Sequence, residues 1–280
     1  MTAFLKMHGL GNDFAVFDTR SGDICLDSAI ARAIGDRKTG VGCDQVIVIG
    51  RQRTVGADAE IRIFNADGGE VESCGNAARC VAQLLLNERD ATDVRIETAG
   101  GLLVCGEAGT GLVTVDMGAP KLDWDEIPLA HPADTNGFSL NVDGTEHFAS
   151  AVSVGNPHCV LIVENAEAAA VAELGPRIEH HPMFPARVNV EFVQVVSRKR
   201  LRMRVWERGA GITRACGTGA CAAAVAAHRR DLCERKVEVV LDGGTLEIEW
   251  RAADNHILMT GPTTLVYRGE IDLAALERTR

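Results

Sequence analysis

The sequence predicts an α+β protein of two pseudo-symmetric domains, each a strand-rich, barrel-like sheet around a buried helix. Three observations support this fold class: landmarks of the first half recur in the second, most of the chain consists of short apolar or alternating runs, and two Ala-rich apolar segments interrupt these runs. A chain of 280 residues with 46% hydrophobic residues is long enough to form two cores. The repeat therefore sets the expected architecture.

The repeat consists of four landmarks in the same order and at a nearly constant spacing. They pair Asn12 with Asn156, Gln45 with Asn189, Asn65 with Glu207, and Cys74 with Cys216. Any one of these matches is expected by chance in some sequences, but four in order are not. A duplicated chain normally forms two similar domains related by a pseudo-twofold axis, so we expect the matched residues to converge on a ligand site between them.

The elements follow from the local patterns. Strands are expected at residues 60–64, 94–98, 112–116, 190–196, 201–206, 237–241, 246–250 and 265–267, with a glycine turn at 242–244. Residues 75–86 and 217–228 are almost uniformly apolar and Ala-rich over about three turns, which is typical of a helix surrounded by protein. Each half is therefore expected to wrap its strands around one such helix.

Cys74 and Cys216 stand directly before these two helices. Unpaired amides and the positive end of the dipole at a helix N-terminus stabilise a thiolate, and the same amides bind carboxylates. Inversion at the α-carbon of an amino acid requires a base on one face, an acid on the other, and donors to the carboxylate. A thiol with an ordinary pKa of ~8.5 suits either role. We therefore expect the two cysteines to form an acid and base pair.

Other roles for the cysteines compete with this one. A free cysteine is most often an inert core residue, but the matched contexts of Cys74 and Cys216 favour function. Metal binding is disfavoured, because Cys80 and Cys221 would point away from the preceding cysteine on a helix and neither spacing resembles a zinc motif. A redox pair of Cys74 and Cys216 stays open, and we expect such a disulfide to inactivate.

Composition and missing motifs restrict the function further. The formal net charge is −10 and the basic residues form no run, which argues against nucleic-acid and membrane partners. The start has no signal peptide pattern and the nine cysteines are an odd number, so we expect a cytoplasmic protein with reduced thiols. With no P-loop, no dinucleotide fingerprint and no evident Schiff-base lysine, we expect neither cofactor nor metal. A small-molecule substrate fits best.

Five segments together resemble diaminopimelate epimerase. They are residues 7–14 (MHGLGNDF), 65–76 (from NADG to ESCGN), 155–158 (GNPH), 188–192 (VNVEF) and 206–219 (from WERG to ACGTG), whereas residues 121–150 carry no such motif. The resemblance implies the fold of that family and a homodimeric enzyme without pyridoxal phosphate. It also implies interconversion of LL- and meso-diaminopimelate, in lysine biosynthesis and peptidoglycan precursor supply.

The resemblance also implies domain limits and residue roles. The half-domain with Cys74 comprises residues 1–117 plus 263–280, since the last strand is expected to return to it, and the half-domain with Cys216 comprises residues 118–262. Backbone amides at Gly75, Asn76, Gly217 and Thr218 would bind the carboxylate at the reacting carbon. The distal end of the substrate would be bound by Asn12, Gln45, Asn65, Asn156, Asn189, Glu207 and Arg208.

Within that set, Glu207 suits a distal ammonium and Arg208 a distal carboxylate. His158 lies inside a repeated landmark and is a candidate to orient a group or carry protons. Two rivals remain: a proline or hydroxyproline racemase, which would not need the distal polar set, and a non-enzymatic thiol redox sensor. The sequence leaves undecided which cysteine is the thiolate at rest.

Overall fold

The computed structural model describes residues 1–22, 26–71 and 74–278 and divides into two compact units. Unit 1 comprises Met1–Val115 and Gly261–Arg280, and unit 2 comprises Asp116–Thr260. Glu72 and Ser73 of the cysteine motif, and Cys25, lie outside the described residues. In the described part of the chain, no helix combines the length and apolar character needed to cross a bilayer.

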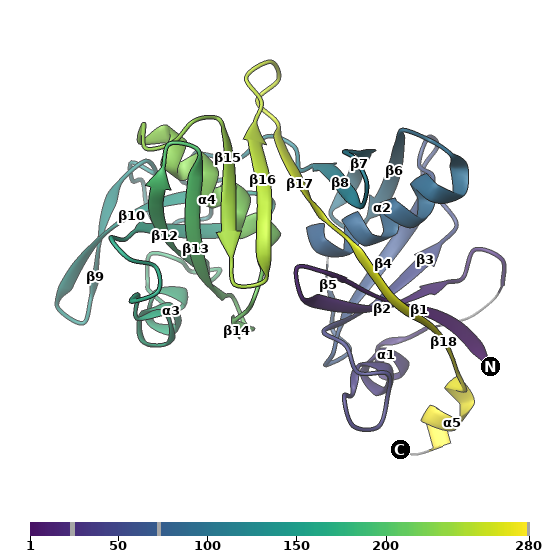
Figure 1. Ribbon diagram of the computed structural model, residues 1–280. Coiled ribbons are helices and arrows are strands. Elements are labelled where there is room, and N and C mark those ends of the chain that lie inside the picture. Colours follow the sequence, from purple (N-terminus) through teal and green to yellow (C-terminus); the bar gives the residue numbers. More distant parts are fainter. Residues whose placement is uncertain (23–25, 72–73, 279–280) are drawn as a thin grey trace. The chain divides into compact units, whose positions relative to one another are not determined.

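In its described residues, unit 1 is a sheet with one long helix and two short ones. Figure 1 shows their arrangement. Its elements are β1 (Thr2–Gly9), β2 (Asn12–Asp18), α1 (Ser28–Gly35), β3 (Gln45–Gly50), β4 (Ala59–Asn65), β5 (Glu70–Val71), α2 (Gly75–Arg89), β6 (Asp93–Thr98), β7 (Gly101–Glu107), β8 (Leu112–Asp116), β18 (Thr264–Ile271) and α5 (Leu273–Arg278). Strand β1 lies between β18 and β2, both antiparallel to it, so the last strand completes the first unit. Strands β2 and β3 are parallel, and β3 and β4 are antiparallel.

Unit 2 repeats this topology. Its elements are β9 (Phe138–Val142), β10 (Thr145–Ser153), β11 (Pro157–Ile162), α3 (Val171–Glu179), β12 (Asn189–Ser197), β13 (Arg200–Glu207), β14 (Gly211–Ile212), α4 (Gly217–Arg229), β15 (Lys236–Leu241), β16 (Gly244–Trp250) and β17 (Ile257–Pro262). Strand β10 lies between β9 and β11, β11 and β12 are parallel, and β12 and β13 are antiparallel. The parallel pairs have the same register, because Phe14 faces Gln45 and His158 faces Asn189.

Each unit encloses one apolar helix. The middle of α2 is buried against β1, β6 and β7, and α4 contacts β10–β13, β15 and β16. Alanine is the most frequent residue of α4, and Ala77, Ala78 and Ala82 lie in the buried part of α2, where small side chains pack without voids. The predicted fold class is therefore confirmed: each unit is a strand-rich sheet around a buried helix.

The strands and helices expected from the sequence are all present, with ends that differ by a few residues. The largest difference is β18, expected at residues 265–267 and observed over Thr264–Ile271. Pairing with β1 extends it, and such pairing between distant segments leaves no local signal. Helices α1, α3 and α5 were not expected. The first is short, with Asp27 capping its N-terminus, and the second contains Gly175 and Pro176, which are weak helix formers.

Candidate active site

Cys74 occupies the N-cap position of α2, with extended backbone angles of φ −148° and ψ 112°. Its carbonyl accepts the first helical hydrogen bond, from the amide of Ala78 at 2.9 Å, while its side chain makes no capping bond. The thiol is half-buried. It therefore lies at the electropositive end of the helix and stays accessible to a small molecule.

Two asparagines surround this thiol. The Cys74 Sγ atom lies 3.8 Å from Oδ1 of Asn12, and Nδ2 of Asn76 donates to the same oxygen at 3.2 Å. Asn12 reaches this place because Leu10 and Gly11 adopt positive φ angles of 57° and 83°, which turn the chain between β1 and β2. The structure thus brings Asn12, Asn76 and Cys74 together.

Gln45 and Asn65 form a second group in unit 1. They face each other across β3 and β4, and Nε2 of Gln45 donates to Oδ1 of Asn65 at 3.0 Å. Gln45 also begins the strand that runs parallel to β2, so it lies at the same sheet edge as Asn12. Polar ends of neighbouring parallel strands gather at such an edge, as the repeat suggested.

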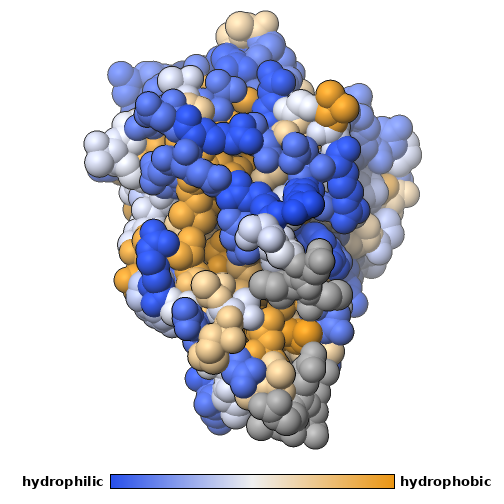
Figure 2. Space-filling model, turned by 90° about the vertical axis from the view of Figure 1, so that its right-hand side faces the viewer, coloured by the Kyte–Doolittle hydropathy of each residue, from blue (hydrophilic) through white to orange (hydrophobic). Residues whose placement is uncertain are grey.

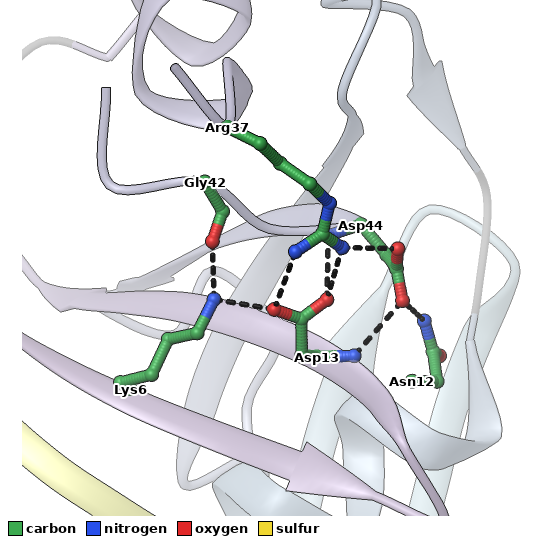
Figure 3. Close-up of polar contacts among 6 residues, drawn as sticks. All are labelled: Lys6, Asn12, Asp13, Arg37, Gly42 and Asp44. Carbon is green, nitrogen blue, oxygen red and sulfur yellow. Dashed lines mark hydrogen bonds and ion pairs between the residues drawn. The ribbon is translucent and has the colours of Figure 1, made fainter. Parts of the chain in front are cut away.

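A cluster of charged residues lies behind Asn12 (Figure 3). Arg37 Nη2 contacts Oδ1 of Asp13 and Oδ1 of Asp44, each at 2.7 Å, and Lys6 pairs with Asp13 at 2.5 Å. Burial alone would raise the pKa of Asp13, but hydrogen bonds from Arg37 and Lys6 outweigh it and hold this pKa well below its usual range. Asp44 Oδ2 accepts hydrogen bonds from Asn12 Nδ2 at 3.1 Å and from the Asp13 amide at 3.0 Å.

Cys216 holds the corresponding N-cap position on α4, with φ −115° and ψ 112°. Its sulfur accepts a hydrogen bond from the amide of Gly219 at 3.4 Å and lies 3.6 Å from the hydroxyl of Thr218. Burial raises the pKa of this thiol well above its ordinary value, and the carboxylates of Glu207 and Glu191 raise it further. The bonds from Thr218 and Gly219 act in the opposite direction.

Glu207 lies beside Cys216. Its carboxylate accepts a hydrogen bond from the hydroxyl of Thr213. Burial raises its pKa above the ordinary value, although hydrogen bonds from Thr213 and the Cys216 thiol lower it in part. A carboxylate with a raised pKa next to a thiol is suited to accept the proton of that thiol.

A buried chain of polar side chains leads away from Thr218. Nδ2 of Asn156 donates to the Thr218 hydroxyl at 3.3 Å, and Oδ1 of Asn156 lies 2.9 Å from Nε2 of His158. Nδ1 of His158 lies 2.7 Å from Oε1 of Glu191, and both side chains are fully buried. His158 is thus connected to Cys216 through Asn156 and Thr218.

Asn189 begins β12, and Arg208 directly follows the end of the neighbouring strand β13. Asn189 donates to the carbonyl of Pro157 at 3.0 Å and accepts from the Arg208 amide at 2.9 Å. The exposed Arg208 guanidinium donates to the carbonyl of Ala186 at 3.1 Å. Glu179 holds the same turn, since it accepts from Trp206 Nε1 at 2.7 Å and from the Gly209 amide at 3.0 Å. Asn189 therefore positions the backbone that carries Arg208.

Asp44, Arg79 and Glu191 are among the residues that hydrogen-bond to the predicted site residues but were not predicted from the sequence. Arg79 is the one charged residue in the apolar run 75–86, and Glu191 interrupts the apolar run 190–193. Both are fully buried. A lone charge in an otherwise apolar run was the available signal, because burial of a charge requires a specific partner.

The remaining cysteines do not resemble a site. The eight cysteines within the described ranges are free thiols, and burial raises the pKa of Cys80 to about 12 and that of Cys43 to about 11. Within residues 1–22, 26–71 and 74–278, no group of three or more His, Cys, Asp and Glu residues is arranged to hold a metal ion. Cys43 does not begin a helix and Cys80 lies inside α2, so neither matches the N-cap position that Cys74 and Cys216 share.

The two-unit fold is shared with solved epimerase structures. A hydroxyproline epimerase from Agrobacterium vitis superposes with a TM-score of 0.67 at 19% identity, covering 96% of this chain and 91% of that one. A probable proline racemase from Agrobacterium radiobacter superposes with a TM-score of 0.68 at 18% identity, covering 98% of this chain and 93% of that one. At this identity the likeness shows the fold, which places the chain in a structural class that includes epimerases and racemases.

Sequence relatives define the family. The diaminopimelate epimerase family model matches residues 4–122 and 150–266, and leaves out the stretch in which we found no motif. Diaminopimelate epimerase of Rhodospirillum centenum is 52% identical over 268 residues, 96% of this chain and 91% of that protein. The enzyme of Phenylobacterium zucineum is 53% identical over 274 residues, which cover 96% of this chain and 97% of that protein. The chain belongs to the diaminopimelate epimerase family and is an isomerase.

Proposed function

We propose that this protein epimerises LL-diaminopimelate to meso-diaminopimelate at the α-carbon, with Cys74 and Cys216 as acid and base. The observation that carries the proposal is the matched position of the two thiols. Each is the N-cap residue of the buried helix in one of two units of the same topology, and each has amide or hydroxyl groups around its sulfur. We propose that the units are the two epimerase half-domains and present these thiols to opposite faces of the substrate.

The proton steps follow from the groups beside each sulfur. Glu207 accepts the proton of the Cys216 thiol, and the resulting thiolate removes the α-proton from one face of the substrate. The Cys74 thiol donates its proton to the other face, which leaves the inverted carbon and a Cys74 thiolate. Backbone amides around Gly75 and Gly217 stabilise the carboxylate charge that develops as the α-proton leaves.

The other site residues bind and orient the substrate. Arg208 is exposed and offers a guanidinium to the distal carboxylate, while Asn65, Gln45, Asn156 and Asn189 line the polar surroundings. Because Glu207 lies against Cys216, we assign it to the thiol rather than to the distal ammonium. His158 is an auxiliary residue that acts through Asn156.

The proposal includes the cellular setting. Side chains supply both the acid and the base, so the reaction needs neither pyridoxal phosphate nor a metal, and its product would enter lysine and peptidoglycan precursor biosynthesis in the cytoplasm. A homodimer is supported by the exposed apolar residues of β18, since Leu265, Val266 and Tyr267 are 40%, 54% and 46% exposed. Figure 2 shows apolar residues gathered in a band on one face of the molecule.

The reaction is tested by NMR of LL-diaminopimelate with the reduced protein in deuterated water. We expect the α-proton signal to disappear while the meso isomer accumulates. Proline and trans-4-hydroxyproline, at equal concentration, are the control substrates and should not exchange. If proline exchanges its α-proton and diaminopimelate does not, the result favours a proline racemase. If no substrate exchanges its α-proton while both thiols are reduced, the result favours a thiol redox sensor.

A further inference from the structure

We propose that Asp44 and Arg79 are positioning residues that hold Asn12 and Asn76 in one hydrogen-bonding orientation, so that an acceptor oxygen faces Cys74 and keeps it a thiol at rest. The inference rests on the proposed function, because it assigns the resting acid of the two-cysteine pair. It goes beyond that function by naming two charged residues that set the protonation of one thiol. Neither residue needs to touch the substrate.

The four side chains form a continuous row in unit 1. Asp44 Oδ2 accepts from Asn12 Nδ2 at 3.1 Å, Asn12 Oδ1 accepts from Asn76 Nδ2 at 3.2 Å, and Asn76 Oδ1 accepts from Arg79 Nη2 at 2.8 Å. The Cys74 sulfur lies 3.8 Å from the same Asn12 oxygen. Figure 3 shows the Asp44 end of the row, where Asn12 turns its amide nitrogen toward the carboxylate.

The charged residues at the two ends fix the direction of this row. An ionised carboxylate only accepts hydrogen bonds and a guanidinium only donates them, whereas an amide offers either atom by a half-turn. Asp44 therefore requires the nitrogen of Asn12, and Arg79 requires the oxygen of Asn76. Both requirements give the same direction of the bond from Asn76 to Asn12. A half-turn of either amide would therefore break this bond and the bond to the charged residue beside that amide.

Each end of the row is itself held in place. Arg37 pairs with Asp44 at 2.7 Å. Arg79 is fully buried, and a Cβ atom on Gly9 would lie 3.2 Å from its Nη2, so glycine leaves the guanidinium room. A buried charge cannot relax into water, and the row therefore stays in the one orientation that satisfies it.

The consequence is a difference between the two thiols. Cys74 faces the amide oxygen of Asn12, which accepts a hydrogen bond from S–H and repels a thiolate. Cys216 faces the amide N–H of Gly219, which donates, and the hydroxyl of Thr218, which can donate. The acceptor at Cys74 therefore holds it as the acid. Burial and the carboxylates of Glu207 and Glu191 raise the pKa of Cys216, so this thiol loses its proton only by direct transfer to Glu207 beside it, and the donors Gly219 and Thr218 then stabilise the thiolate.

The test is the pH profile of Cys74 alkylation by iodoacetamide without substrate, followed by peptide mass spectrometry. Asp44→Asn keeps the size of the side chain but can bond to either atom of the Asn12 amide, so turning the Asn12 nitrogen toward the sulfur then breaks only the bond from Asn76 instead of two bonds. We expect the alkylation midpoint to fall by about one pH unit, which is a tenfold rise in rate below the midpoint. Asp44→Glu keeps an acceptor-only group and should restore the wild-type profile.

A matched control comes from the other end of β2. Asp18 is as exposed as Asp44 and also pairs with an arginine, but it lies at the far end of the strand that begins with Asn12. Asp18→Asn should leave the profile unchanged. Asn12→Ala removes the acceptor and spares the ion cluster, so it should reproduce the shift if Asp44→Asn does not fold.

An unchanged midpoint in folded Asp44→Asn, or in Asn12→Ala, overturns the inference. This readout needs no turnover, so it separates the inference from the proposed function. A wild-type protein that fails to exchange diaminopimelate would remove the function, whereas an alkylation shift in the same protein would still establish that the amide row sets the state of Cys74.

Discussion

Replacement of Glu207 by glutamine tests the proposed proton acceptor. The amide has nearly the same shape as the carboxylate and can still accept the hydrogen bond from Thr213, but it cannot take the proton of Cys216. Turnover should fall because Cys216 then lacks a nearby base, while substrate binding should change little. The variant therefore separates proton transfer from binding.

The expected loss in kcat is at least about 100-fold, because general acid and base groups contribute roughly 10²–10⁴ to the rate. This corresponds to about 2.7 kcal/mol in the activation free energy. KM should stay within about threefold of the wild-type value, since a group that acts only in the proton step affects kcat and kcat/KM alike.

The stability of Glu207→Gln should not fall with its activity. Burial raises the pKa of Glu207 in the folded protein, so folding favours its protonated form. Any stability that this gives is present below the unfolded pKa of ~4.3 and is lost as pH rises through the folded pKa. At pH 8 the folded protein bears the cost of a buried carboxylate, which glutamine removes. The unfolding temperature of Glu207→Gln at pH 8 should therefore equal or exceed that of the wild type.

Initial rates of LL-diaminopimelate epimerisation and thermal melts measure the two effects. Glu238→Gln is the matched control, because Glu238 is a half-exposed carboxylate of unit 2 that pairs with Arg200 on the surface. A Glu207→Gln rate within threefold of the wild type would refute the assignment. A lowered melting temperature together with lost activity would indicate a structural role instead.

Three further predictions concern the surroundings of the site. Asp13→Asn should lower the free energy of unfolding at pH 7 by about 3 kcal/mol, because it leaves the buried Lys6 with the Gly42 carbonyl but without the negative charge that pairs with it. A urea titration measures this loss. The loss should shrink as pH falls below ~4, since the lowered pKa of Asp13 contributes stability above its unfolded value. Gly219→Ala should lower the free energy of unfolding by about 1–3 kcal/mol and reduce kcat, because the added Cβ would lie 2.8 Å from Glu191 Oε1. Arg208→Ala should raise KM by at least about 30-fold, the loss of a charged hydrogen-bond pair.

Controls for these variants are available in the same chain. Gly22→Ala adds a methyl group with no atom within 4 Å and should leave kcat unchanged. Arg200→Ala removes an exposed arginine from the other end of β13 and should leave KM unchanged. Each prediction has one outcome that would contradict it. These outcomes are a stability of Asp13→Asn equal to that of the wild type at pH 7, full activity of Gly219→Ala, and an unchanged KM for Arg208→Ala.

The sequence predicted the fold class and the two helices because their signals are local. An apolar, Ala-rich run of three turns preceded by cysteine occurs twice, and alternating runs mark the strands around it. Helix α3 was missed because Gly175 and Pro176 disfavour an isolated helix. Tertiary packing stabilises the helix instead: Gly175 lies so close to Trp206 that a Cβ there would be 2.5 Å from the Trp206 Cγ atom.

The site was predicted in part for a similar reason. The matched pairs, such as Asn12 and Asn156, stand out by comparing one half of the chain with the other. Asp44 and Arg79 have no counterpart of this kind, and their function depends on a row of hydrogen bonds between segments far apart in sequence. The resemblance implied a distal role for Glu207, and our proposal assigns it to Cys216 instead, because its raised pKa and its contact with Cys216 become visible only in the folded chain.

The central claim is that both thiols are needed, one on each side of the reacting carbon. Its most direct test is the rate of LL-diaminopimelate epimerisation by Cys74→Ala and by Cys216→Ala, with Cys80→Ala as the control for removal of a buried thiol from the same helix. We predict that the first two variants lose at least about a thousandfold in kcat while they remain folded, and that Cys80→Ala retains most of it. Full turnover by either Cys74→Ala or Cys216→Ala would contradict the two-base mechanism.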